Sequence, residues 1–161
     1  MKLISESIAI KQLANVREEF RRELAKDYEH RARPCSSCTT PGECCLDEHF
    51  VNVRVSRLEV TAIRTAVSDL HENLRSAVFA RLERIEPDAE FYSCPLYHPG
   101  IGCVVHNTAK PMPCIAHACY ERKEDLPPDE LLSARELEID ELNRKVFGRG
   151  QTLIPIHASL R

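Results

Sequence analysis

Four of the eight cysteines stand within one eleven-residue segment, and this segment constrains the fold more than any other feature of the chain. It reads Cys35-Ser-Ser-Cys38-Thr-Thr-Pro-Gly-Glu-Cys44-Cys45. A C-x-x-C turn brings two sulfurs to about 3.8 Å from each other, as a tetrahedral ion with metal–sulfur bonds of about 2.3 Å requires. Pro41-Gly42 predicts a second turn that returns the chain toward the same point. An extended Cys44-Cys45 pair would point its side chains to opposite faces, so we expect different neighbours for the two thiols.

The other four cysteines lie in one later block of the chain. They are Cys94, Cys103, Cys114 and Cys119. About fifty residues without cysteine, largely helical in pattern, separate this block from the first group. The sequence therefore predicts two halves of one metal-binding core over residues 35–119, with all eight cysteines as ligands. In particular, we expect Cys35, Cys38 and at least two cysteines of the later block to converge on one centre.

Composition and charge decide how these thiols are interpreted. The 161 residues fit a single domain, 1–161, and the net charge of −3 gives no electrostatic footprint for nucleic acid. No apolar run is long enough to span a membrane, and the first residues lack the apolar core of a signal peptide, so we expect a cytoplasmic protein. In a reducing compartment, dense thiols favour metal binding or catalysis. The alternatives are a secreted, disulfide-stapled domain and isolated core cysteines.

The rest of the chain predicts a mainly α fold with a small β component (α+β), in which helices surround a cysteine-rich, loop-dominated core. An N-terminal helix over 7–32 is indicated by apolar residues at three- and four-residue steps, and Pro34 ends it. These apolar residues are Leu13, Val16, Phe20, Leu24 and Tyr28. A C-terminal helix over 128–148 begins after Pro127 and closes at Gly148. We expect both helices to bury their apolar stripes against the helices in the middle of the chain.

The middle of the chain carries strand and capping signals. Val51, Val53 and Val55 alternate with polar residues, which predicts a short strand. The segments Ser56–Glu59 and Asp69–Glu72 both match the capping box, so each predicts the start of a helix. The tail 152–156 predicts an edge strand or an extended arm, because Pro155 excludes a central strand.

Three histidines fall inside the proline-rich segment 91–128, where bonds to a metal would replace missing secondary structure. They are His98, His106 and His117. Each is a candidate ligand as a neutral imidazole, and each is alternatively a surface residue or a group that supports the ligands.

Taken together, these motifs resemble the YkgJ-type cysteine-cluster family, which is described as a zinc- or iron-chelating domain. The family pattern is C-x-x-C-x-x-C-C, then C-P-x-L, then G-C-x-[IV]-Y-x-x-R-P-x-x-C-R, and the resemblance covers about residues 35–119. It implies as ligands Cys35, Cys38, Cys44, Cys45, Cys94, Cys103 and Cys114. Cys119 lies outside the pattern, and its assignment as a ligand is based on the grouping of the thiols alone.

The chain departs from that pattern at several positions. Five residues separate Cys38 from the cysteine pair, where the family has a shorter loop. His106, Lys110 and Ile115 stand in place of a Tyr and two Arg residues. Loss of both arginines weakens any site for an anionic substrate, since Lys lacks the planar fork.

Three functions compete. The first is a metalloprotein with an iron-sulfur cluster in redox or protein-modification chemistry, because irregular cysteine spacing suits such clusters; flagellin lysine methylases are similar in carrying this kind of cysteine cluster. The chain shows no glycine-rich nucleotide loop, with only five glycines, and the sequence leaves the catalytic residues unknown. The alternative is a structural zinc-binding interaction module without catalysis. The third is a thiol redox switch at the C-x-x-C motif.

Overall fold

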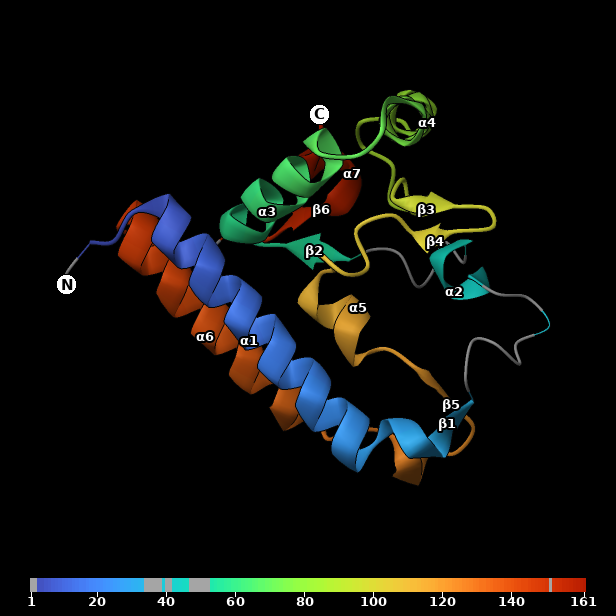
Figure 1. The fold of residues 1–161 in the computed structure, drawn as a ribbon, viewed down its shortest axis with the longest axis vertical. Coiled ribbons are helices and arrows are strands. Elements are labelled where there is room, and N and C mark those ends of the chain that lie inside the picture. Colours follow the sequence, from blue (N-terminus) through green and yellow to red (C-terminus); the bar gives the residue numbers. More distant parts are fainter. Residues whose placement is uncertain (1–2, 34–38, 40–41, 47–52, 151) are drawn as a thin grey trace. The chain divides into compact units, whose positions relative to one another are not determined.

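The computed structural model describes residues 3–33, 39, 42–46, 53–150 and 152–161. These residues form mainly helices, with short antiparallel strand pairs, which confirms the predicted fold class (Figure 1). Contacts divide the chain into two compact units: unit 1 is Met1–Thr39 with Pro111–Gln151, and unit 2 is Thr40–Lys110 with Thr152–Arg161. A single domain over 1–161 stays a prediction. No helix within the described ranges has the length and apolar character needed to cross a membrane.

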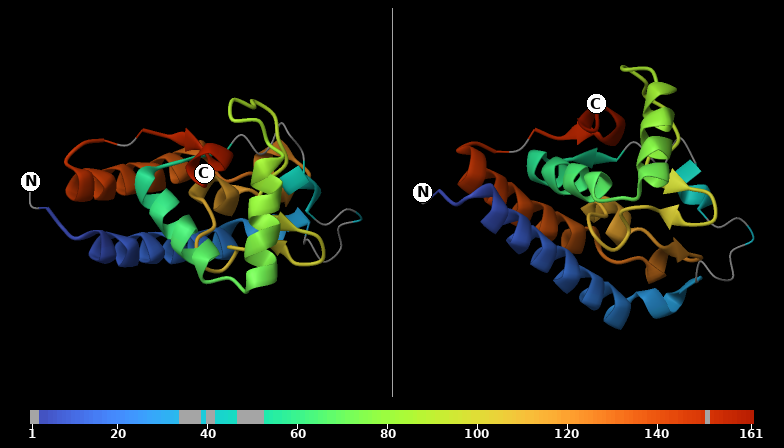
Figure 2. Two further views of the ribbon diagram at one scale, coloured as in Figure 1. Left: turned by 90° about the horizontal axis from the view of Figure 1, so that it is seen from above. Right: turned by 45° about the horizontal axis from the view of Figure 1, so that its top comes forward.

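Unit 1 is built on two long helices, α1 (Glu6–Asp27) and α6 (Asp129–Phe147), which lie side by side (Figures 1 and 2). Their apolar stripes are buried, with Leu13, Phe20 and Leu24 on α1 and Ile139 and Leu142 on α6. We expected the middle helices to cover these stripes. Instead the two terminal helices cover each other, because an amphipathic stripe specifies that it needs cover but not which helix supplies it.

Polar contacts fix α1 and α6 as an antiparallel pair. The Ile4 N–H donates to the Lys145 carbonyl at 3.0 Å, which joins the start of α1 to the end of α6. At the other end, Arg135 forms ion pairs with Glu23 at 2.9 Å and with Glu138 at 2.7 Å. The two helices are therefore held at both ends.

The bounds of these helices follow from their caps. The Ser5 side chain accepts from the Ile8 N–H at 3.3 Å and starts α1. The α1 helix ends at Asp27, five residues earlier than predicted, because Tyr28 leaves the helical conformation and a 3-10 turn, η1 (Glu29–Arg31), follows. The α6 helix runs almost as predicted, and Gly148 ends it in the left-handed region with φ of 74°.

The remaining elements of unit 1 carry its described cysteines. A short helix, α5 (Met112–Ala116), contacts both α1 and α6. Strand β1 (Ala32–Arg33) pairs antiparallel with β5 (Cys119–Tyr120), and a 3-10 turn, η3 (Lys123–Asp125), leads toward α6.

Unit 2 contains short helices and two strand pairs. Its helices are α2 (Glu43–Leu46), α3 (Arg57–Ser68), α4 (Glu72–Glu83) and α7 (Ile156–Ser159). Strand β2 (Arg54–Val55) pairs with β6 (Ile154–Pro155), and β3 (Tyr97–His98) pairs with β4 (Gly102–Cys103), both antiparallel. The tail therefore forms an edge strand, which is one of its two predicted forms. The predicted strand over 51–55 is present as β2, and Val51 lies outside the described residues.

One of the two predicted capping boxes is present in unit 2. The Glu59 carboxylate accepts from the Ser56 N–H at 3.0 Å, and the Ser56 hydroxyl accepts from the Glu59 N–H at 3.3 Å. The second segment does lead into a helix, α4, but its capping box is not formed, because Asp69 is the C-cap of α3 and His71 is the N-cap of α4. The His71 Nδ1 accepts from the Asn73 N–H at 3.4 Å.

Candidate metal centre

Cys44 and Cys45 lie in a single helical turn, α2. The Cys45 N–H donates to the Gly42 carbonyl at 2.8 Å, so the turn starts at that glycine. The pair is therefore not extended, so the reason given for different neighbours does not hold, and the expectation of different neighbours stays a prediction. Gly42 allows the helical turn because its φ of 85° is a conformation that other residues rarely adopt.

Gly42 also fixes where α2 lies in unit 2. A Cβ placed on this glycine would stand 2.2 Å from Cε2 of Tyr97. No side chain fits in that space, so the tyrosine ring of β3 lies directly against the backbone that precedes the cysteine pair. Figures 1 and 2 show α2 beside the β3–β4 pair.

Cys94 joins the two cysteine groups through the backbone. Its N–H donates to the Cys45 carbonyl at 2.9 Å, although 48 residues separate the two positions in the sequence. The Cys94 side chain is buried. Burial, and next the charge of Cys94, raise the pKa of Tyr92, so this thiol is close to the Tyr92 hydroxyl.

Cys103 enters the same region from β4, where it is paired with Tyr97 of β3. The turn between these strands ends at Gly102, whose φ is 85°. The Val104 N–H donates to the Leu96 carbonyl at 2.9 Å and continues the strand contact past Cys103. The hairpin therefore sets the position of this cysteine in the backbone.

The charges of two other thiols act on Cys45. The pKa of Cys45 is raised to about 12, first by burial, then by the charges of Cys44 and Cys103 and by a hydrogen bond with Cys44, while Lys110 acts in the opposite direction. A cysteine from each of the two sequence groups thus shares one environment with Lys110. We name Cys44, Cys45 and Cys103 the unit 2 thiol cluster.

The unit 2 thiol cluster has the donor chemistry of a zinc or iron site, since both metals accept thiolates. Its geometry is not yet that of a ligand set. Over the described ranges of the chain, no three or more His, Cys, Asp or Glu side chains are placed to hold one ion. A metal would have to draw these thiols closer together or recruit ligands from elsewhere in the chain.

The other predicted ligands belong to unit 1 or lie outside the described residues. Cys114 lies on α5 and Cys119 on β5, both in unit 1. Cys35 and Cys38 lie outside the described residues, so their convergence with the later block stays a prediction. The six described cysteines are present as thiols; they are Cys44, Cys45, Cys94, Cys103, Cys114 and Cys119.

The three histidines stay candidate ligands. The His98 Nδ1 lies 2.8 Å from the Pro99 carbonyl, a contact that orients the ring and leaves Nε2 as the atom for a ligand. His106 is exposed, and His117 is the C-cap of α5.

Two features of this region were missed by sequence reasoning. The contact between Gly42 and Tyr97 gave no signal, because neither residue predicts the other. For Lys110 there was a weak signal in the sequence, since this residue stands where the family pattern has an Arg. In the structure its charge acts on Cys45.

No protein-family model matches the chain, and neither a curated protein nor a solved structure does. The resemblance to the YkgJ-type family therefore stays a prediction that rests on the cysteine motifs.

Proposed function

We propose that the chain binds a metal through cysteine thiolates, as an iron-sulfur cluster or as zinc, in the reducing environment of the cytoplasm. The observation that carries the proposal is the unit 2 thiol cluster, in which the charges of Cys44, from one sequence group, and of Cys103, from the other, both act on Cys45. Cys94 supports it through its backbone bond to Cys45 at 2.9 Å. Together these contacts concern four of the eight proposed ligands.

The physical reason for a metal is charge. Thiols that are gathered and partly buried repel one another when they ionise, and a cation removes that repulsion as it displaces their protons. Lys110 supplies one positive charge to the same environment. One lysine does not balance several thiolates, whereas a divalent metal or an iron-sulfur cluster takes them as ligands.

Between the two metals, an iron-sulfur cluster is our preferred assignment. Structural zinc sites commonly pair two C-x-x-C motifs, and this chain has one such motif followed by an adjacent pair and four separate cysteines. A cluster would support redox or protein-modification chemistry. Zinc would instead make the protein a structural interaction module, which is the second candidate.

The test is anaerobic purification of the full chain, followed by absorbance and by iron, sulfide and zinc analysis. Brown protein with iron and acid-labile sulfide supports the iron-sulfur assignment. Colourless protein with stoichiometric zinc, even from iron-supplemented anaerobic cells, supports the structural module. Metal-free protein that stays folded with eight reactive thiols would remove the proposal.

A pair of variants tests the role of the unit 2 thiol cluster. We expect Cys45→Ser to lose most of the bound metal, because it removes the thiol that bonds with Cys44 and on which the charge of Cys103 acts. The backbone bond from Cys94 to residue 45 is kept in this variant. Thr108→Ala is the matched control, since its hydroxyl donates to the Val105 carbonyl in the same block and removes no thiol. Equal metal content in Cys45→Ser and in the control would exclude Cys45 as a ligand.

A further inference from the structure

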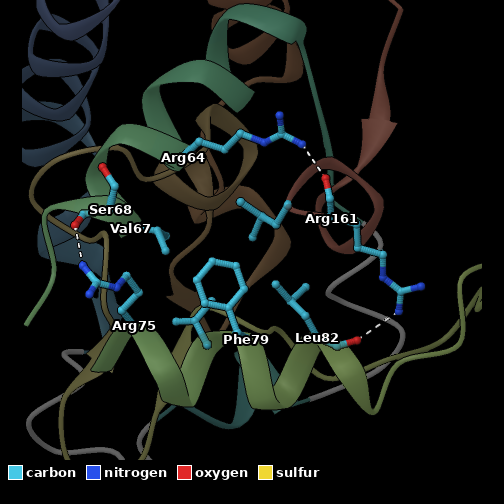
Figure 3. Close-up of a pocket in the computed structure, with 9 residues that line it drawn as sticks. Arg64, Val67, Ser68, Arg75, Phe79, Leu82 and Arg161 are labelled. Atoms are coloured by element: carbon cyan, nitrogen blue, oxygen red, sulfur yellow. Dashed lines mark hydrogen bonds between the residues drawn. The ribbon is translucent and has the colours of Figure 1, made fainter. Parts of the chain in front are cut away.

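Unit 2 contains a cavity of about 300 Å³ between α3, α4 and the last residues of the chain (Figure 3). The described residues that line it are Arg64, Val67, Ser68, Arg75, Val78, Phe79, Leu82, Leu160 and Arg161. None of them is a cysteine. The cavity is therefore distinct from the unit 2 thiol cluster, and its volume is at the lower end for small-molecule pockets, which start at about 300 Å³.

The wall of the cavity is apolar. Val67, Val78, Leu82 and Leu160 are buried side chains, and Phe79 beside them is 46% exposed. Figure 3 shows Val67, Phe79 and Leu82 pointing into the space between α3 and α4. An apolar group that covered this surface would gain about 25 cal/mol for each Å² removed from water.

Three arginines stand around that apolar wall, and no acidic side chain is among the nine described lining residues. Each arginine is held by a main-chain oxygen, with distances of 2.9 Å from Arg64 to Ser159, 3.0 Å from Arg75 to Ser68 and 2.9 Å from Arg161 to Leu82. Arg64 donates a second bond to a main-chain oxygen of Arg161 at 2.6 Å, and Arg161 donates a second bond to the Ile85 carbonyl. Among the described residues, Arg75 therefore uses fewer bonds of this kind than the other two arginines. A guanidinium also has more N–H donors than such bonds use.

An adjoining cavity of about 530 Å³ has a different charge from the first, so the two ends of the site differ. It shares Phe79 and Leu82 with the first cavity, but its lining adds Glu83 and Glu86 and does not include Arg64 or Arg75. An anionic group is favoured on the side of Arg64 and Arg75, away from the two carboxylates. An apolar group is favoured along Phe79 and Leu82.

We propose that this cavity binds a soluble medium-chain carboxylate. Its alkyl chain lies along Val67, Phe79 and Leu82, and its carboxylate lies on the side of Arg64 and Arg75. A carboxylate can accept two parallel hydrogen bonds from the planar, charged fork of a guanidinium. A short alkyl chain matches the small apolar space. The proposal is independent of the metal, because no cysteine lines the cavity.

The test is calorimetric titration of the full chain, with its metal content as purified, using octanoate as the probe. We expect saturable binding of octanoate and none of octylammonium, which has the same alkyl length and the opposite charge. Acetate, which has the charge without the chain, is expected not to bind. Vesicles of anionic phospholipid are expected not to bind either, since the cavity admits one short chain.

Variants locate the binding. Arg75→Gln should weaken octanoate binding about tenfold, the effect of losing one charge-assisted hydrogen bond. Arg84→Gln is the matched control, because this arginine is the exposed C-cap of the same helix and does not line the cavity. Phe79→Asp places a negative charge beside the apolar wall on an exposed side chain, so it should abolish binding while the protein stays folded.

Melting temperatures measured beside each titration separate a lost site from a lost fold. The proposal is overturned if octylammonium binds as tightly as octanoate, if octanoate shows no saturable binding, or if folded Phe79→Asp binds like the wild type. Preferential binding to anionic vesicles would also overturn it, in favour of a membrane surface. None of these outcomes depends on whether a metal is bound.

Discussion

Arg33 and Cys119 stand directly opposite each other in the antiparallel pair of β1 and β5. This register places Cys119 beside the strand that ends two residues before Cys35 in the sequence. An Arg33–Glu121 ion pair, at 2.6 Å, joins β1 to the residue that follows β5. The backbone pairing therefore sets the position of a predicted ligand that lies outside the family pattern.

The Arg33–Glu121 ion pair should contribute little to this arrangement. Its side chains are 54% and 66% exposed, and exposed pairs contribute about 0–1 kcal/mol. Glu121→Gln should therefore change the free energy of unfolding by less than about 1 kcal/mol in urea denaturation. Arg135→Gln serves as the comparison, since Arg135 is 21% exposed and pairs with Glu23 and Glu138. An equal effect of the two variants would contradict this assignment.

The packing of α1 on α6 should dominate the stability of unit 1. Phe20 is fully buried, so Phe20→Ala should lower the free energy of unfolding by about 3–5 kcal/mol through lost apolar contact and the cavity left behind. Leu137→Ala on α6 is the control, because Leu137 is 70% exposed and should change stability little. Thermal and denaturant unfolding measure both. Comparable losses in the two variants would show that the helices do not pack in this way.

Gly42→Ala should destabilise unit 2, because the new Cβ would meet the Tyr97 ring at 2.2 Å and the φ of 85° is strained for alanine. Gly100→Ala is the matched control, with φ of 80° and no atom within 4 Å of the added Cβ. The control should cost only the conformational term, about 1 kcal/mol, and Gly42→Ala clearly more. Adding Tyr97→Ala to Gly42→Ala should remove the extra loss of stability that Gly42→Ala shows over Gly100→Ala. If both single variants unfold alike, the tyrosine contact is not a constraint.

Asp125 should make stability depend on acidity. A hydrogen bond from Arg122, at 2.7 Å between Nε and Oδ2, lowers the pKa of this carboxyl, and the arginine charge acts in the same direction. The pair therefore stabilises the protein above the unfolded pKa of about 3.9, and its contribution is lost as the pH falls through the lowered folded value. In Asp125→Asn, the free energy of unfolding should depend less on pH in that acidic range than it does in the wild type.

Glu124→Gln is the control for that comparison, because Glu124 lies 3.8 Å from the same arginine and is exposed. It should keep the wild-type dependence on pH. An acidic loss of stability that is identical in wild type and Asp125→Asn would remove Asp125 as its source.

The helices of this protein were largely predictable where short-range signals decide them. Ser56 and Glu59 form the capping box that their spacing predicts, and Gly148 closes α6 as expected. His71 was missed as the N-cap of α4 because Asp69 offered the more common capping residue. In the native chain Asp69 already follows the end of α3, so it is not available to start the next helix.

Long-range relations were not predictable from the same patterns. The stripe of Leu13 and Phe20 does not encode α6 as its partner, and nothing in the sequence places Tyr97 against Gly42. Two adjacent residues such as Cys44 and Cys45 carry no periodicity, so a helical turn and an extended pair were equally open. The cysteines of the candidate site could be named from the sequence, and their role as metal ligands stays a prediction, whereas the environment shared by Cys45, Cys103 and Lys110 needed the structure.

The interleaving of the two units has a consequence for biosynthesis. Unit 1 joins Met1–Thr39 to Pro111–Gln151, and unit 2 joins Thr40–Lys110 to Thr152–Arg161, so each unit needs a segment from the end of the chain. Such high contact order delays folding, because distant segments must meet before burial repays the lost entropy. While the ribosome is still translating 111–161, all the cysteines up to Cys103 have already been made, and α1 has no α6 to pack on. The nascent chain thus holds six thiols and an uncovered apolar helix at the same time.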